Sequence, residues 1–397
     1  MMKYWEIKLT CSSPVHIGSG HIYKKSEYIC YTKNKKAYVH FLNETKWAEY
    51  LLKENLLETF VSELERNPLR LSIYEFLKKN ADHQFIHHVI EDMIKKGICS
   101  HPVIADMENT DNQRNTLNDI HGCIKDENGH MYIPGSSLKG AFRTAIFVKW
   151  LQEHKERYTK EWEKIVQEIE NGMYGEKPPY VMRKTGKTRK TGKIGKIMED
   201  MEREIFIIPD KEKKRNMTNS LLRGLSVSDT GPALKPGEIV QKADAGENGG
   251  RHTISLWREC MMRGEEIFFT LGIDDTIMAN LGVTDAESLI KCTQNFVDYQ
   301  CDLLWDSLSG HDEIESMQDA DLILGGGAGF LSKTVMYALA PEKQDGVRAV
   351  QKIMKKKFPR GRHGKGEQIS PHTLKLAKMG RDYQVMGMCQ LSVVKEL

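Results

Sequence analysis

Hydrophobic and polar residues alternate at the start of the chain. Trp5, Ile7 and Leu9 would face one side of the backbone and Glu6 and Lys8 the other, which is typical of a half-buried strand. Similar alternation, or a short apolar run, predicts strands in six further segments: 36–42, 204–208, 222–228, 253–256, 267–273 and 384–394.

A helical period follows the first strands. Asn43 or Thr45 can cap a helix that runs to about Lys53, and residues 56–97 are predicted to be helical in two or three pieces, broken near Pro68 and Asp82. Residues 120–133 resemble a hairpin with turn residues at 127–129. Further helices are predicted at 136–149, 152–170, 286–308 and 331–340.

The order of these elements indicates an α+β protein. The succession strand, helix, strands, helix, strand occurs once in each half, which fits two modules of the split βαβ kind. We expect an N-terminal domain over residues 1–200 with a helical insertion at 56–97 and a basic linker at 177–196. The C-terminal domain would cover residues 201–397 and carry a glycine-rich loop at 325–329.

The basic residues are unevenly distributed along the chain. The 397 residues carry a formal net charge of only +3, but residues 177–196 hold eight Lys/Arg and residues 352–365 hold seven, with no acid in either segment. Such segments create local positive fields that attract polyanions, although solvated loops have the same composition.

Cysteine usage and hydropathy favour the cytoplasm. None of the eight cysteines forms a C-x-x-C pair, so zinc-ribbon and thioredoxin sites are disfavoured and buried, reduced thiols are expected. The N-terminus lacks the apolar core of a signal peptide, and no segment is apolar enough to span a bilayer.

The segment Ile133–Arg143, I-P-G-S-S-L-K-G-A-F-R, is the most informative motif. Ser136 or Ser137 would cap a helix whose free N–H groups form a seat for phosphate. Lys139 and Arg143 are four residues apart and would project along one helix face. The alternative is a capped helix with surface cations. The spacing does not match a Walker loop, so ATP binding is disfavoured.

Two other loops are rich in glycine. His16, Gly18, Ser19 and Gly20 belong to P-V-H-I-G-S-G at a strand end, where amides and the serine could contact an RNA backbone; a tight turn is the alternative. Four glycines, Gly325, Gly326, Gly327 and Gly329, precede Phe330 and Lys333. Phe330 could stack on a base or anchor a core.

Signals for catalysis are weak. His83 and His87 could share a helix face, but no third ligand is apparent, so no metal site is predicted. The chain has no nucleophile elbow and no H-E-x-x-H motif. We expect no cofactor and no enzymatic activity.

Together, P-V-H-I-G-S-G, I-P-G-S-S-L-K-G-A-F-R and G-G-G-A-G-F resemble the signature motifs of the RAMP superfamily of CRISPR proteins. The length, the early H-I-G-S-G and the segment 257–259 before Gly264 are most similar to the family of fifth Csm subunits of type III-A effector complexes. The resemblance implies two ferredoxin-like, RRM-related modules with helical insertions.

The resemblance also implies a function. Such a subunit would bind CRISPR RNA (crRNA), cap its 3′ portion and support crRNA maturation and complex assembly in antiviral defence. Its partners would be the stacked backbone RAMP subunit, the small helical subunit, target RNA indirectly, and host nucleases, with no membrane. The resemblance places RNA contacts at His16, Gly18, Ser19, Gly20, Ser136, Ser137, Lys139, Arg143, the 325–329 loop and Lys333. Backbone subunits of these complexes cut RNA with a loop aspartate; Asp106 lies in an expected loop but is not assigned that role.

The rival hypothesis is a metal-independent CRISPR repeat-processing endoribonuclease of the same superfamily. His16, assisted by a residue such as Tyr23, would then act as general acid/base. The chain length and the S-S-L-K-G motif oppose this hypothesis. A pure protein scaffold would leave the glycine-and-lysine loops unexplained.

Overall fold

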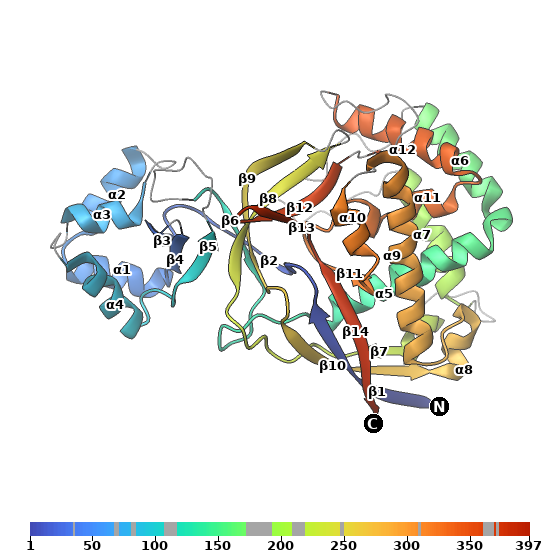
Figure 1. Ribbon diagram of the computed structural model, residues 1–397, viewed down its shortest axis with the longest axis horizontal. Coiled ribbons are helices and arrows are strands. Elements are labelled where there is room, and N and C mark those ends of the chain that lie inside the picture. Colours follow the sequence, from blue (N-terminus) through green and yellow to red (C-terminus); the bar gives the residue numbers. More distant parts are fainter. Residues whose placement is uncertain are drawn as a thin grey trace.

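The structure of the chain is a computed structural model with two β-sheets, a helical layer and a helical lobe (Figure 1). It describes residues 1–34, 36–66, 71–80, 85–106, 117–171, 193–208, 219–246, 250–308, 311–359, 369–370 and 373–397. The predicted α+β class is confirmed.

The first sheet has five strands in the order β11-β14-β1-β10-β7, and every neighbouring pair is antiparallel. With β11 set aside, the remaining order, fourth-first-third-second along the chain, is that of a split βαβ unit. Its strands are β1 (Met2–Cys11), β7 (Leu225–Val227), β10 (Glu266–Asp274), β11 (Leu322–Ile323) and β14 (Met388–Glu396).

Alternation in β1 explains how this sheet packs. Trp5, Ile7, Leu9 and Cys11 are buried, as predicted, while the residues between them are partly exposed. The buried side chains join one core with Leu138, Phe142 and other residues of the helical layer. That layer consists of α5 (Gly135–Glu153), α6 (Thr159–Glu170), α7 (Lys193–Phe206), α8 (Asp275–Met278), α9 (Ala286–Leu308), α10 (Asp312–Met317), α11 (Met336–Leu339) and α12 (Lys343–Lys357).

The second sheet has nine strands. Its main path is β2-β6-β9-β8-β5-β4-β3, and β12 adds to β8 and pairs with β13. The pairs β5–β8 and β6–β9 are parallel, and the others are antiparallel. The strands are β2 (Gly18–Tyr23), β3 (Tyr28–Lys33), β4 (Lys36–Phe41), β5 (Val103–Asp106), β6 (Ile120–Cys123), β8 (Glu238–Gly246), β9 (Arg251–Cys260), β12 (Thr373–Met379) and β13 (Asp382–Val385).

A helical lobe projects from the β3–β5 edge of this sheet (Figure 1). It has its own core around Trp47, Phe60 and Phe76. Asn43 accepts a hydrogen bond from the Lys46 amide at 3.1 Å, so the predicted cap is confirmed. The lobe helices are α1 (Glu44–Lys53), which precedes the predicted insertion, and α2 (Leu57–Arg66), α3 (Ile73–Asn80) and α4 (Ile86–Lys95), which lie within it.

Several local predictions need correction. Residues 204–208 were predicted as a strand, but they include the end of α7, whose apolar residues recur at helical spacing. Asp106 ends β5 rather than lying in a loop. The charged helix predicted from residue 152 begins at Thr159, after a 3-10 turn over Lys155–Tyr158.

The expected division at residue 200 does not separate the sheets. Strand β1 lies between β10 and β14, so the first sheet combines the two ends of the chain. Independent folding of the two halves stays a prediction. Most of the expected basic linker, 177–192, lies outside the described residues, and its last four residues begin α7.

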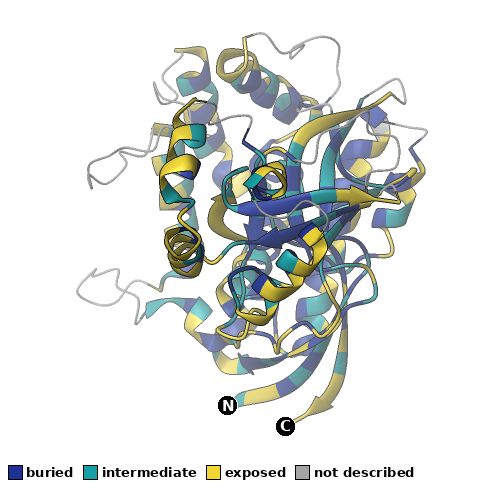
Figure 2. Cartoon of the chain, turned by 90° about the vertical axis from the view of Figure 1, so that its left-hand side faces the viewer, coloured by how far each residue is buried: buried dark blue, intermediate teal, exposed yellow. Residues whose placement is uncertain are grey.

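Burial is concentrated on the strands and on the inner helix faces (Figure 2). All eight cysteines are buried and unpaired, which confirms the expected buried thiols. Within the described ranges, no helix combines the length and apolarity that crossing a bilayer requires.

Candidate nucleic-acid interface

The first glycine-rich loop (residues 14–20) and the third (residues 325–329) meet, although they lie far apart in the sequence. The Gly326 amide donates to the His16 carbonyl at 2.7 Å, and the Gly387 amide donates to the Pro14 carbonyl at 2.9 Å. The Leu324 amide in turn donates to the Gly387 carbonyl at 2.8 Å. We call residues 14–18, 324–329 and 386–387 the glycine seam.

Glycine is required in the seam for two reasons. Gly325, Gly327 and Gly329 have φ values of +87°, +93° and +92°, which residues with a Cβ rarely adopt. A Cβ on Gly325 would also lie 2.4 Å from the His16 carbonyl oxygen, and one on Gly327 would lie 2.6 Å from the Met386 sulfur. The group that approaches this loop closely is therefore the chain itself.

His16 is buried in the seam, with 4% of its surface exposed. Its Nδ1 lies 2.8 Å from the Glu259 carbonyl oxygen, so Nδ1–H is the donor and Nε2 carries the lone pair. Burial lowers the pKa of His16 to about 4, and the positive charge of Arg258 acts in the same direction. The ring is therefore neutral at pH 7.

Glu259 holds the neighbouring hairpin as well as His16. Its buried carboxylate pairs with Lys125 at 2.6 Å and accepts the Cys123 amide at 3.1 Å. One residue thus fixes the histidine ring through its carbonyl and strand β6 through its side chain.

A row of cations borders the seam, and most of it was not predicted. Burial, and then the charge of Arg258, lowers the pKa of Lys333. Burial, and then the charge of Lys375, lowers the pKa of Lys242, on which Arg258 also acts. We call Lys242, Arg258, Lys333 and Lys375 the cationic row.

The cationic row lies directly beside the third loop. The Lys375 stem lies 3.5 Å from the position that a Gly329 Cβ would take. Asp244 binds Lys375 at 2.8 Å and lies 3.6 Å from Lys242. Alternation in the unpredicted strand β8 would have placed Lys242 on one face, but only the strand pairing brings it to Arg258.

Ser19 and Gly20 extend the seam along β2. Ser19 is exposed, and its hydroxyl donates to the Gly122 carbonyl at 3.1 Å. Gly20 has φ +88° and a Cβ there would meet nothing within 4 Å, so a ligand can approach this backbone. Tyr23, on the same strand, has its pKa raised by burial and then by Glu259.

The second motif, Ile133–Arg143, does not belong to the glycine seam. Helix α5 begins at Gly135 with Pro134 at the N-cap, so the prediction that Ser136 or Ser137 caps it is wrong. The Gly135 amide donates to the Asp229 carboxylate at 2.7 Å, which occupies part of the expected phosphate seat. A Cβ on Gly135 would lie 2.3 Å from the Val227 carbonyl oxygen, so this motif packs against the end of β7.

The two cations of this motif have partners within the chain. Lys139 donates to the Leu225 carbonyl at 2.5 Å, and Arg143 forms an ion pair with Glu202 of α7. Burial lowers the pKa of both side chains. The hydrogen bonds of the described residues join this motif to β7 and α7 and do not join it to the seam.

Phe330 is partly buried and packs against the main core. This contact matches the alternative of a core anchor, and a stacking role stays a prediction. Lys333 closes a 3-10 turn that follows the loop.

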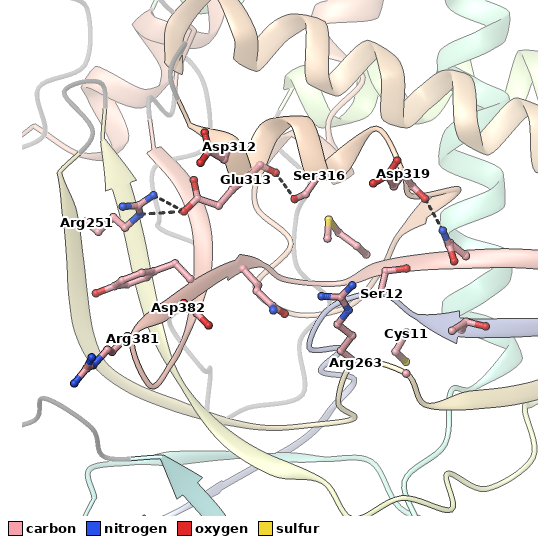
Figure 3. Close-up of a pocket in the computed structure, with 16 residues that line it drawn as sticks. Cys11, Ser12, Arg251, Arg263, Asp312, Glu313, Ser316, Asp319, Arg381 and Asp382 are labelled. Carbon is pink, nitrogen blue, oxygen red and sulfur yellow. Dashed lines mark hydrogen bonds and ion pairs between the residues drawn. The ribbon is translucent and has the colours of Figure 1, made fainter. Parts of the chain in front are cut away.

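A separate cavity of about 610 Å³ lies between β1, β9, β13 and α10. Arg251 points toward Glu313, with which it forms an ion pair at 2.8 Å (Figure 3). Arg263 and Arg381 line the same cavity as Asp312 and Asp382. Because basic and acidic side chains are mixed there, the cavity should attract a polyanion less strongly than the cationic row does.

Within the ranges that the structure describes, no cluster of three or more His, Cys, Asp or Glu could hold a metal. His83, the weak candidate ligand, lies outside those ranges.

Comparison with known proteins gives concordant similarities. A family model described as the RAMP superfamily matches residues 8–332. The CRISPR system Cms protein Csm5 of Mycobacterium tuberculosis is 24% identical over 413 residues, covering 99% of this chain and 98% of that protein. Csm5 of Enterococcus italicus is 31% identical over 153 residues, covering 36% of this chain and 43% of that protein.

Solved structures share the fold. A chain of a type III-A Csm–crRNA–target RNA ternary complex aligns with a TM-score of 0.59 at 19% identity, covering 99% of this chain and all of that one. The crystal structure of T. onnurineus Csm5 aligns with a TM-score of 0.54 at 16% identity, covering 96% and 99%.

Proposed function

Because the chain belongs to the RAMP superfamily, we propose that it is a non-catalytic, RNA-binding subunit of a type III-A Csm effector ribonucleoprotein. The glycine seam and the cationic row would hold the crRNA. The observation that carries this proposal is the 2.7 Å hydrogen bond between Gly326 and His16, which joins two glycine loops beside four cations.

The physical argument rests on backbone access and charge. Glycine loops let a ribose-phosphate backbone approach closely, and clustered Lys/Arg bind its phosphates without reading sequence. The lowered pKa values of Lys242 and Lys333 show that burial and neighbouring cations disfavour their charged forms. Phosphates placed there would relieve that repulsion.

The finer roles follow the likeness to Csm5 proteins. The chain would cap the 3′ portion of the crRNA and support its maturation, with host nucleases as possible partners. It would contact the stacked backbone subunit and the small helical subunit in the cytoplasm, and meet target RNA only indirectly. The similarity to a chain of a Csm–crRNA–target RNA complex supports this part of the proposal.

The start of α5 is a second proposed contact region. Ser136 is exposed and Ser137 partly exposed, and each could meet a phosphate directly. Lys139 and Arg143 would have to exchange their internal partners for RNA.

The proposal is tested on the complex purified with its guide. Lys333→Ala combined with Lys375→Ala should reduce guide occupancy, measured by sequencing and quantifying the bound RNA. Lys160→Ala combined with Lys164→Ala on α6 is the matched control and should leave occupancy unchanged. Equal occupancy in both double variants would refute binding at the cationic row.

The endoribonuclease hypothesis has its own test. Incubation of the chain with CRISPR repeat RNA in EDTA would reveal a site-specific product that His16→Ala abolishes. A neutral, buried His16 held at Nδ1 fits a positioning role better than proton transfer to a substrate.

A further inference from the structure

A second set of aromatic rings lies on the helical lobe, away from the seam. Tyr31 of β3 stacks on Tyr38 of β4, with ring centroids 5.4 Å apart and planes 11° apart. Tyr31 also contacts Tyr74 of α3 at 5.4 Å and His87 of α4 at 5.1 Å. We call these four residues the tyrosine patch.

The tyrosine patch differs from the aromatic core of the same lobe. Trp47, Phe60 and Phe76 contact one another and are 6%, 8% and 1% exposed. The three tyrosines of the patch are partly exposed, and His87 is exposed. Tyr31 and Tyr74 also pack against that core, and all three tyrosines keep part of their surface exposed to solvent.

Two lysines extend the patch toward the tip of the hairpin. Lys33 and Lys36 are direct partners in the β3–β4 ladder, two positions beyond the Tyr31–Tyr38 pair and therefore on the same face. Like charges directly opposite one another destabilise a sheet. Both lysines are exposed and can reach a bound anion, although Lys36 also has the acidic residue Asp106 as its direct ladder partner on β5.

Tyr38 of the patch and Arg258 of the cationic row lie on the same face of one sheet. Direct partners in adjacent strands share a face, and the register links Tyr38 to Ile104 and Ile104 to Glu238. Val240, two positions along β8 from Glu238, is the partner of Arg258. From β9 to β4 this face spans three strand spacings, about 14 Å.

We propose that the tyrosine patch is a second RNA-binding site, in which a nucleobase of single-stranded RNA stacks on the tyrosines while Lys33 and Lys36 bind the adjacent phosphates. This inference rests on the proposed function, since the RNA would continue from the seam across the shared face. Stacking on aromatic side chains tolerates any base, so the site takes RNA without sequence preference.

The test uses the full chain and a fluorescent single-stranded RNA, with affinity measured by anisotropy. Tyr38→Ala should weaken binding roughly tenfold, since it removes one stacking surface. Tyr38→Phe keeps the ring and should stay within about twofold of the wild type. Tyr4→Ala, which removes an exposed tyrosine from the other sheet, is the control and should change nothing. In the unmodified chain, RNA containing 4-thiouridine should crosslink within residues 28–40.

The outcomes separate the two proposals. If Tyr38→Ala binds like the wild type, or crosslinks appear only at the seam, the inference is overturned and the patch is a surface for protein. If the Lys333/Lys375 double variant nevertheless loses RNA binding, the further inference is overturned and the proposed function survives. If the unmodified chain binds no RNA, both proposals are overturned.

Discussion

The Nδ1 atom of His16 lies 2.8 Å from the carbonyl oxygen of Glu259, and this contact ties the first glycine loop to strand β9. The Glu259 side chain binds Lys125 and the Cys123 amide, so one residue links β9, the seam and the hairpin after β6. The first glycine loop is therefore held by the Glu259 main-chain carbonyl and by the third loop, while the buried Glu259 carboxylate holds the hairpin.

Replacing Glu259 tests this arrangement. Glu259→Gln should lower the free energy of unfolding by about 2–4 kcal/mol, because the buried ion pair loses its charge while Lys125 stays partly buried. Urea denaturation is the measurement. Glu266→Gln, which alters an exposed pair with Lys8, should change stability by less than about 1 kcal/mol. Equal effects would show that Glu259 has no special role in stability.

The lowered pKa of His16 predicts a pH dependence of stability. The unfolded histidine titrates near 6.5 and the folded one at about 4, so the unfolded state binds the proton first as the pH falls. Stability from this group is present above pH 6.5, declines between pH 6.5 and pH 4, and amounts to about 3 kcal/mol at most. Comparing urea midpoints at pH 7.5 and pH 5 measures it. His16→Gln should flatten that difference; an unchanged difference would assign it to other groups, such as His40.

Alanine is predicted to have opposite effects at two glycines, Gly327 in the third loop and Gly140 in helix α5. Gly327→Ala should destabilise the chain by about 2 kcal/mol or more, because the residue has φ +93° and its Cβ would meet Met386. Gly140→Ala, inside α5 with nothing within 4 Å of the new Cβ, should stabilise by up to about 1 kcal/mol. Thermal unfolding of both variants measures these changes in stability. A Gly327→Ala variant as stable as the wild type would contradict the seam geometry.

Salt dependence should report the phosphates bound by the cationic row. For single-stranded RNA the logarithm of affinity falls with the logarithm of salt by about 0.7 per phosphate contact. Lys333→Ala combined with Lys375→Ala should therefore weaken binding and reduce the slope by roughly 1.4. Anisotropy titrations over a range of KCl concentrations give the slope. A weaker affinity with an unaltered slope would mean that these lysines do not contact phosphates.

The start of α5 gives a graded prediction. Lys139→Ala combined with Arg143→Ala should weaken guide retention less than the Lys333/Lys375 double variant, since the hydrogen bond and ion pair of these two side chains hold them to β7 and α7 and not to the glycine seam. Arg143→Ala alone should alter stability by less than about 1 kcal/mol, because its ion pair with Glu202 is partly exposed. A larger loss of guide at α5 than at the row would make this helix the main RNA contact.

Local structure could be predicted from the order of residues wherever one strong pattern dominates. Alternation fixed the buried face of β1, the Asn43 cap fixed the start of α1, and uninterrupted helical spacing fixed α9 at Ala286–Leu308. The strand predicted at residues 204–208 was wrong because Ile205 and Phe206 are apolar neighbours in a short window. Only with Ile197 and Met201 do they form the apolar stripe of α7.

Which of the motifs come together depends on long-range strand pairing. Alternation assigns a residue to a face, but it does not say which strand is the neighbour, and β1 pairs with strands from the far end of the chain. The contact of Gly326 with His16 and the meeting of Arg258 with Lys242 depend on that pairing. The I-P-G-S-S-L-K-G motif packs against β7 for the same reason, because long-range pairing is set by how the whole chain buries its apolar faces.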